Sequence, residues 1–133
     1  MSFTHRFKEN NMEFKKYVDG NMITEEMAKV YRNDTTGYEI RIYTEPLGNP
    51  SFHVLYKDVW EVVLQIKDLK VLEIKHGKLF KKGEFLPVNI KKDIINILNE
   101  YRKGRLTYWD FLLITWNAIN EKFPVDESMR IPK

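Results

Sequence analysis

The sequence predicts an α+β domain, with an antiparallel β-meander of four or five strands covered by two C-terminal helices. Between residues 28 and 74, short stretches in which apolar and polar residues alternate are separated by turn residues. That pattern is typical of antiparallel strands joined by tight connections. After Pro87 the apolar residues recur at helical spacing in two successive segments. Helices that follow a run of strands commonly cover one face of the sheet.

The strands begin with a predicted hairpin, whose arms are 28–32 and 38–43 and whose turn is Asn33–Gly37. Val30 is expected to share one face of this hairpin with three residues of the second arm, Tyr38, Ile40 and Ile42. Alternation places Glu39, Arg41 and Tyr43 on the other face. Pro46 and Pro50 exclude regular structure from the next segment, because each proline removes a backbone donor.

Three further strands are predicted at 52–56, 59–66 and 70–74. The second of these is almost continuously apolar, so we expect both of its faces to be covered. In the third, alternation points Val71 and Glu73 one way and Leu72 and Ile74 the other.

Two helices are predicted after Pro87. The first has Asn89 as its N-cap and Gly104 as a left-handed terminator. Its apolar stripe is Ile90, Ile94, Ile97, Leu98 and Tyr101. The second begins at Thr107, where Asp110 completes a capping-box pattern, and it stops at Phe123-Pro124. Its apolar stripe is Trp109, Leu112, Leu113, Trp116 and Ile119.

These elements are expected to form one domain at 24–123, with an N-terminal extension at 1–23 and a loose polar tail at 124–133. Within the extension a short helix is predicted over Met12–Val18. Thr24 has the character of a helix N-cap, although the residues after it fit a strand equally well.

The composition excludes several classes of protein. The 133 residues include no cysteine, which excludes a disulfide framework, a thiol nucleophile and a thiolate metal site. No apolar run is long enough to span a membrane, and the first residues lack the apolar block of a secretory signal. We therefore expect a cytoplasmic protein, and nothing in the sequence calls for a cofactor.

Positive charge is concentrated in the middle of the chain. Residues 67–105 hold eleven Lys/Arg against five Asp/Glu, whereas residues 1–66 hold eight against ten and residues 106–133 hold three against four. Such asymmetry indicates an anionic partner. The candidate nucleic-acid or partner-binding residues are Lys75, Lys78, Lys81, Lys82, Lys91, Lys92, Arg102, Lys103 and Arg105.

Two aromatic residues, Phe80 and Phe85, lie among these lysines. If they are exposed, the lysines can hold phosphates while the rings stack on unpaired bases. The alternative is a solvated face that serves solubility or another protein, with both rings tucked under the sheet. The sequence leaves both interpretations open.

The segment Asn49-Pro50-Ser51-Phe52-His53-Val54-x-Tyr56 resembles the motif N-P-P-H-x-H-V, with a following tyrosine, of a small bacterial domain-of-unknown-function family, family 4160. Arg41-Ile42-Tyr43, Glu45 and Trp116 fit the same pattern, and the similarity covers roughly residues 26–120. Ser51 replaces the family's first histidine, which removes the basis for a paired-histidine site. The resemblance implies a bacterial or phage mobile-element setting of toxin–antitoxin type, and no known chemistry.

His53 with Glu45 is the strongest catalytic candidate, because a carboxylate that orients a histidine makes it a general base. The alternative is a strand histidine whose ring bonds a backbone group of the proline loop. A metal site formed by His5, His53 and His76 is disfavoured, because their spacing does not match a helical site and no cysteine assists.

Three functions remain open. The leading hypothesis is a non-enzymatic intracellular binding protein that engages RNA or a protein–RNA complex through a basic face; a phage-encoded inhibitor of a host defence machine belongs to this class. The first rival is a small toxin-type ribonuclease that uses His53. The second is a protein–protein adaptor that binds through Phe3, Phe7 and Phe14.

Overall fold

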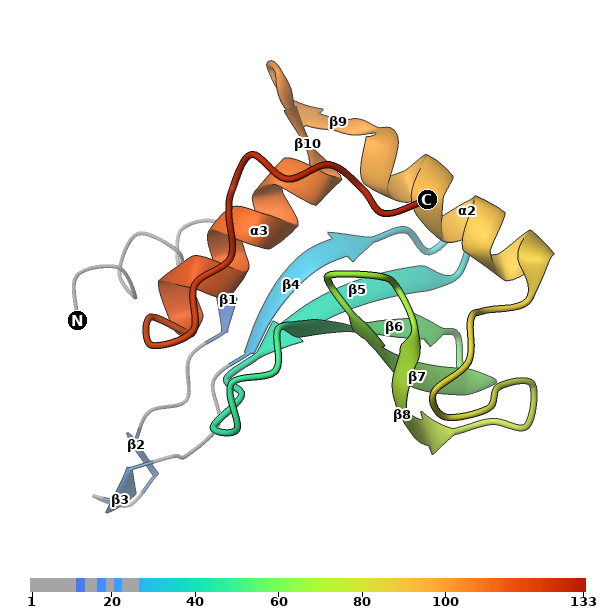
Figure 1. Ribbon diagram of the computed structural model, residues 1–133, viewed down its shortest axis with the longest axis horizontal. Helices are drawn as coiled ribbons and strands as arrows, with labels where there is room; N and C mark the ends of the chain where they lie inside the picture. Colours follow the sequence, from blue (N-terminus) through green and yellow to red (C-terminus); the bar gives the residue numbers. More distant parts are fainter. Residues whose placement is uncertain (1–11, 14–16, 19–20, 23–26) are drawn as a thin grey trace.

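The computed structural model describes residues 12–13, 17–18, 21–22 and 27–133 (Figure 1). Its main feature is an antiparallel meander of five strands: β4 (Met27–Arg32), β5 (Tyr38–Tyr43), β6 (Ser51–Tyr56), β7 (Trp60–Gln65) and β8 (Val71–His76). Two helices, α2 (Val88–Asn99) and α3 (Tyr108–Ile119), follow and lie over one face of the sheet (Figure 1). The predicted α+β meander with two C-terminal helices is therefore confirmed.

Short strands make up the remaining regular structure of the described residues. β1 (Met12–Glu13) pairs with β4 at the edge of the sheet. Two small hairpins stand apart from it: β2 (Tyr17–Val18) with β3 (Asn21–Met22), and β9 (Tyr101–Lys103) with β10 (Leu106–Thr107). Because 12–13 and 17–18 are extended, the helix predicted over Met12–Val18 is wrong at these positions. Thr24 lies outside the described residues.

Strand alternation divides the sheet into two unlike faces. Ile40 pairs with Val54 and Val54 with Val62, so these three fully buried side chains share one face. Tyr38 lies on the same face, and its hydroxyl donates a hydrogen bond of 2.9 Å to Asp93 of α2. This is therefore the face that the helices cover, and the division of the β5 side chains between two faces agrees with the predicted alternation. Residues at the alternate positions point to the opposite side, which we call the open sheet face.

α3 holds to the sheet through its apolar stripe. The helix contacts β4 and β5. The predicted stripe is buried throughout: Trp109, Leu112, Leu113, Trp116 and Ile119. Each such side chain contributes about 1.5–3 kcal/mol when it is buried. The capping box is also confirmed, because Asp110 N–H donates to the Thr107 hydroxyl at 3.1 Å and Thr107 N–H donates to the Asp110 carboxylate at 3.0 Å.

α2 differs from its prediction at both ends. Its N-cap is Pro87, without a side-chain hydrogen bond, so Asn89 is not the cap. The helix ends at Asn99 because Glu100 is already extended, and Gly104, with φ +58°, lies in the turn of the β9–β10 hairpin instead. Tyr101 consequently leaves the apolar stripe and is 70% exposed. The buried part of the stripe is Ile94, Ile97 and Leu98.

A β-bulge changes the side-chain pattern of β8. Leu72 is an extra residue, because its neighbours Val71 and Glu73 pair with consecutive residues of β7. One inserted residue shifts the alternation by one position. Val71 and Ile74 both pack against the core, so the expectation that they point to opposite sides is wrong.

Residues 124–133, expected to be a loose tail, fold back on α3. The helix itself ends at Ile119, earlier than the predicted stop at Phe123-Pro124. The indole of Trp109 donates to the Met129 carbonyl at 2.8 Å, and the Asn117 amide both donates to and accepts from the backbone of Val125. Among the described residues, neither helix is long and apolar enough to cross a membrane.

Candidate functional site

The nine basic residues singled out in the sequence do not form one surface. α2 has 12 residues and separates what lies at its two ends by about 18 Å (Figure 1). Two groups result: Lys81, Lys82, Lys91 and Lys92 before α2 or in its first turns, and Arg102, Lys103 and Arg105 on and beside β9. Lys75 and Lys78 lie at the end of β8 and in the loop that leads to Lys81.

Phe85 lies in the sequence between the lysines of the first group, and it is 54% exposed although it is large and apolar. The ammonium groups of Lys70 and Lys91 each lie 5.1 Å from the centroid of this ring, which is a cation–π distance. Lys81 and Lys82 lie in the turn directly before Phe85. This turn is closed by a backbone hydrogen bond of 3.1 Å that Glu84 N–H donates to the Lys81 carbonyl. We call Lys70, Lys81, Lys82, Phe85 and Lys91 the Phe85 surface.

The chain on both sides of Phe85 is fixed. Before it, Val71 N–H donates to the Glu84 carbonyl at 2.8 Å, and Gly83 N–H donates to the Val71 carbonyl at 2.7 Å. After it, Leu86 is buried in the core. The loop is therefore tied to β8 on one side of Phe85 and to the core on the other, which leaves the ring held outside.

The four lysines of the Phe85 surface are not neutralised by direct ion pairs within the described part of the chain, although the Asp68 carboxylate accepts a 3.0 Å hydrogen bond from the backbone N–H of Lys70. The first turn of α2, which contains Lys91, has no acidic residue and no side-chain cap. Its backbone N–H groups add the partial positive charge of a helix N-terminus.

Two of the other basic residues make contacts within the protein, whereas Lys78, Lys103 and Arg105 form no ion pair among the described residues. Arg102 packs its guanidinium 3.9 Å from the centroid of the Phe111 ring, and Lys75 forms an ion pair with Glu73 at 3.2 Å. Phe80 is buried, and its ring centroid lies 4.8 Å from that of Trp60. Of the two loop phenylalanines, Phe80 therefore belongs to the core and Phe85 to the surface.

On the open sheet face, the carboxylate partner of His53 is Glu61. Nδ1 of His53 lies 2.9 Å from the Glu61 carboxylate and donates to it, since a carboxylate only accepts. The side chains are 11% and 17% exposed. Burial lowers the pKa of His53 and outweighs Glu61, which raises it, so the ring is neutral at neutral pH. The predicted pairing with Glu45 is not formed; the Glu45 backbone N–H donates to the Asn120 side chain at 2.6 Å.

Polar side chains next to His53 extend this cluster along the sheet. The ring centroid of Tyr43 lies 4.4 Å from that of His53, and the Tyr43 hydroxyl accepts a hydrogen bond of 3.2 Å from Arg41. Arg41 stands opposite His53 in the ladder and also forms an ion pair with Glu39. Each charged group of this cluster thus has a partner inside the protein.

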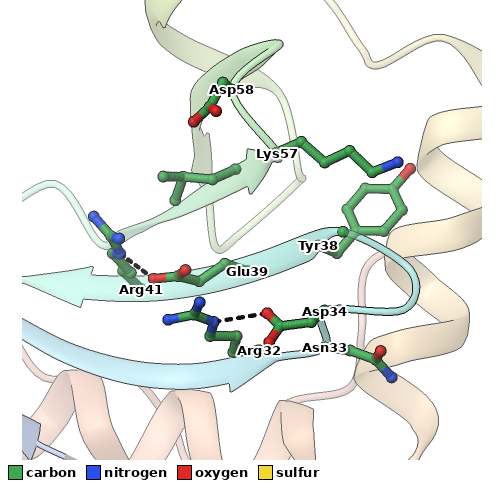
Figure 2. Close-up of a pocket in the computed structure, with 10 residues that line it drawn as sticks. Arg32, Asn33, Asp34, Tyr38, Glu39, Arg41, Lys57 and Asp58 are labelled. Carbon is green, nitrogen blue, oxygen red and sulfur yellow. Dashed lines mark hydrogen bonds and ion pairs between the residues drawn. The ribbon is translucent and has the colours of Figure 1, made fainter.

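A pocket of about 270 Å³ adjoins the cluster, between the β4–β5 and β6–β7 turns. Figure 2 shows two ion pairs in it, Arg32 with Asp34 at 3.0 Å and Arg41 with Glu39. Lys57 extends toward the hydroxyl of Tyr38. The charges that line the pocket balance, because it has three cations and three carboxylates: Arg32, Arg41 and Lys57 against Asp34, Glu39 and Asp58. Such a pocket has no net attraction for a polyanion.

No group of three or more His, Asp or Glu side chains could hold a metal ion within the ranges that the structure describes. His76 is exposed at the end of β8, where it pairs with Glu61 in the ladder, whereas His53 is buried. His5 and the aromatic residues of the predicted adaptor segment, Phe3, Phe7 and Phe14, lie outside the described residues.

Comparisons of the chain with protein-family models, with curated proteins and with solved structures gave no match. The resemblance to a family of unknown function, suggested by the segment at 49–56, therefore stays a prediction. Function has to be inferred from the geometry of the site alone.

Two important residues are missing from the sequence prediction, Glu61 and Lys70. The position of Glu61 could have been predicted from the strand register. With a turn at 57–59, position 53 pairs with 63 and position 55 with 61, which places Glu61 diagonally beside His53. Lys70 has no such signal, because it reaches Phe85 only through the return of the loop to Val71.

Proposed function

We propose that the protein binds RNA, alone or within a protein–RNA complex, through the Phe85 surface, and that it does so without catalysing a reaction. The observation that carries the proposal is an exposed aromatic ring, Phe85, grouped with four lysines that have no ion-pair partner among the described residues: Lys70, Lys81, Lys82 and Lys91. The open sheet face, by contrast, is charged but internally paired.

The physical reason is electrostatic. Lysines that contact phosphates release condensed counterions, so binding weakens steeply as the salt concentration rises. An ammonium group already paired with a carboxylate gains less from a phosphate, because the existing pair must first be broken. The proposal thus uses only part of the basic set that the sequence suggested. The residues that it leaves outside the binding surface include Arg102, Lys103, Arg105, Lys75 and Lys78.

Two double charge reversals test the assignment. Lys81→Glu with Lys82→Glu and Lys103→Glu with Arg105→Glu change the net charge equally, and all four side chains are exposed. We expect the first pair to weaken binding of a fluorescein-labelled RNA roughly 10-fold or more at low salt, measured by anisotropy, because glutamates at these positions repel the phosphates that the lysines attract. The second pair should have a much smaller effect.

Equally weakened binding in both variants would show that only net charge matters, and the Phe85 surface would then not be the binding site. Thermal denaturation of each variant checks that the fold is intact. The proposed setting is the cytoplasm of a bacterium or of a phage's host cell. An inhibitor of a host defence machine that contains RNA is one protein of this kind.

RNA cleavage is a second candidate function, favoured by one observation. Glu61 orients His53 through a 2.9 Å hydrogen bond, with Arg41 opposite His53 in the ladder, and a general base next to a guanidinium suits phosphodiester chemistry. The side chain of His53 is only 11% exposed, which is why binding is the leading proposal. Cleavage that His53→Ala and Glu61→Gln both abolish, with the fold intact, would establish an enzyme.

A further inference from the structure

We infer that Phe85 is a stacking platform for an unpaired base, which makes the Phe85 surface selective for single-stranded over double-stranded RNA. This inference depends on the proposed RNA binding and adds to it the form of RNA that is bound. It is carried by three features of the ring: its exposure, its fixed position and the cations around it.

The exposure of Phe85 has no structural explanation in the core. The core is continuous on both sides of it, through Phe80 and Leu86, which are 7% and 5% exposed. Phe85 could have been a polar residue without loss of that packing. A large aromatic side chain that is 54% exposed presents a hydrophobic surface to solvent, and the contacts that hold this ring are those with the ammonium groups of Lys70 and Lys91.

The fixed backbone makes the ring a usable platform. Glu84 is hydrogen bonded to Val71, and Leu86 is buried. A base that stacks on a positioned ring does not have to immobilise a loop, so less of the stacking energy is lost to ordering.

The cations supply the second half of the recognition. Lys70 and Lys91 come from different elements, the segment before β8 and the first turn of α2, and both ammonium groups lie 5.1 Å from the ring centroid. Because both ammonium groups lie over the ring, a base that stacks on Phe85 displaces at least one of them, and the displaced lysine stays close enough to bind a phosphate of the same strand. Aromatic rings flanked by positive groups are how single strands are bound without sequence preference.

A duplex cannot use this platform. Its bases are already stacked on one another, and paired bases do not offer their faces to a protein surface. Double-stranded RNA would therefore meet only the lysines, and substitution of Phe85 would not change its affinity.

The test measures full-length protein against a short labelled oligouridine and a labelled RNA duplex of equal length. We expect Phe85→Ala and Phe85→Leu to weaken oligouridine binding roughly 5- to 100-fold, the range for removal of one base–aromatic stack, and to leave duplex binding unchanged. Phe85→Trp should retain the oligouridine affinity of the wild type, because tryptophan keeps an aromatic face. Leu79→Ala is the matched control, since Leu79 is 61% exposed in the same loop, and it should have no effect.

The outcomes separate the two proposals. Suppose that the charge-reversal variant loses binding, but Phe85→Ala either lowers the affinity for oligouridine and duplex equally or changes neither affinity. The stacking platform is then refuted, while the proposed RNA binding stands. Retention of oligouridine affinity by Phe85→Leu would also refute it, because leucine has no aromatic face. If the wild-type protein binds neither RNA in a salt-sensitive way, the proposed function fails as well.

Discussion

The open sheet face and the Phe85 surface are both rich in charge, but they use it in opposite ways. On the sheet face, Arg32, Arg41 and His53 each have a carboxylate partner. Around Phe85, the lysines have no such partner among the described residues. One region satisfies its charges internally, and the other leaves them available to a partner.

The difference teaches that an unusual side chain is not by itself a sign of function. A buried histidine next to a carboxylate attracts attention as a catalytic candidate. Its low exposure and its hydrogen bond to a carboxylate are equally those of a structural polar cluster. If this contrast is correct, changes on the sheet face should reduce stability and leave RNA binding intact, and changes on the Phe85 surface should do the reverse.

The largest expected effect contrasts the two phenylalanines of one loop. Phe80→Ala should destabilise the fold by about 3–5 kcal/mol, because it leaves a cavity beside Trp60, whereas Phe85→Ala should change stability by less than about 0.5 kcal/mol. Urea denaturation followed by tryptophan fluorescence measures both. A similar decrease in stability in the two variants would mean that Phe85 is a core residue, and the contrast would fail.

A smaller effect is expected from the sheet-face cluster. Glu61→Ala should cost about 1–3 kcal/mol, because it leaves the buried Nδ1 donor of His53 without its acceptor. Glu73→Ala is the control, since that side chain is 55% exposed and its removal should cost less than about 0.5 kcal/mol. Neither change should alter RNA affinity. An intact fold with weakened RNA binding in Glu61→Ala would instead make the sheet face part of the site.

The smallest effect is a dependence of stability on pH. Burial lowers the pKa of folded His53 below its unfolded value of about 6.5. The unfolded chain therefore binds more protons between these two values, so the stability that neutral His53 contributes is complete above about pH 6.5 and declines as the pH falls toward the folded pKa.

Unfolding free energies at about pH 7 and about pH 5 test this dependence. His53→Gln should lose less stability than the wild type on acidification, while His76→Gln, at an exposed position, should lose as much as the wild type. If His53→Gln and the wild type have the same dependence, His53 does not carry the pH effect.

Most of the fold could be predicted from the sequence, because local patterns determine it. Alternation identified the strands of the meander, and the stripe from Trp109 to Ile119 identified α3 together with its capping box. The failures occur where a single residue changes the local rule. The extra Leu72 in β8 reverses the alternation, and Gly104 closes a hairpin rather than ending α2.

Less of the site could be predicted, because the positions of charged residues in the sequence do not show which of them the fold brings together. The basic stretch reads as one segment, yet α2 separates the lysines before and at its start from Arg102, Lys103 and Arg105 after its end. Phe80 and Phe85 have equivalent sequence surroundings, and only the packing of Phe80 on Trp60 distinguishes them.

The salt dependence of RNA binding tests the central claim most directly. The affinity of the wild type and of a variant with Lys70, Lys81, Lys82 and Lys91 changed to glutamine is measured for a single-stranded RNA over a series of salt concentrations. We predict weaker binding by the variant and a slope of log K against log [salt] that is shallower by about 0.7 for each phosphate that the variant no longer neutralises. Identical slopes and affinities for the two proteins would contradict the claim that these lysines bind RNA.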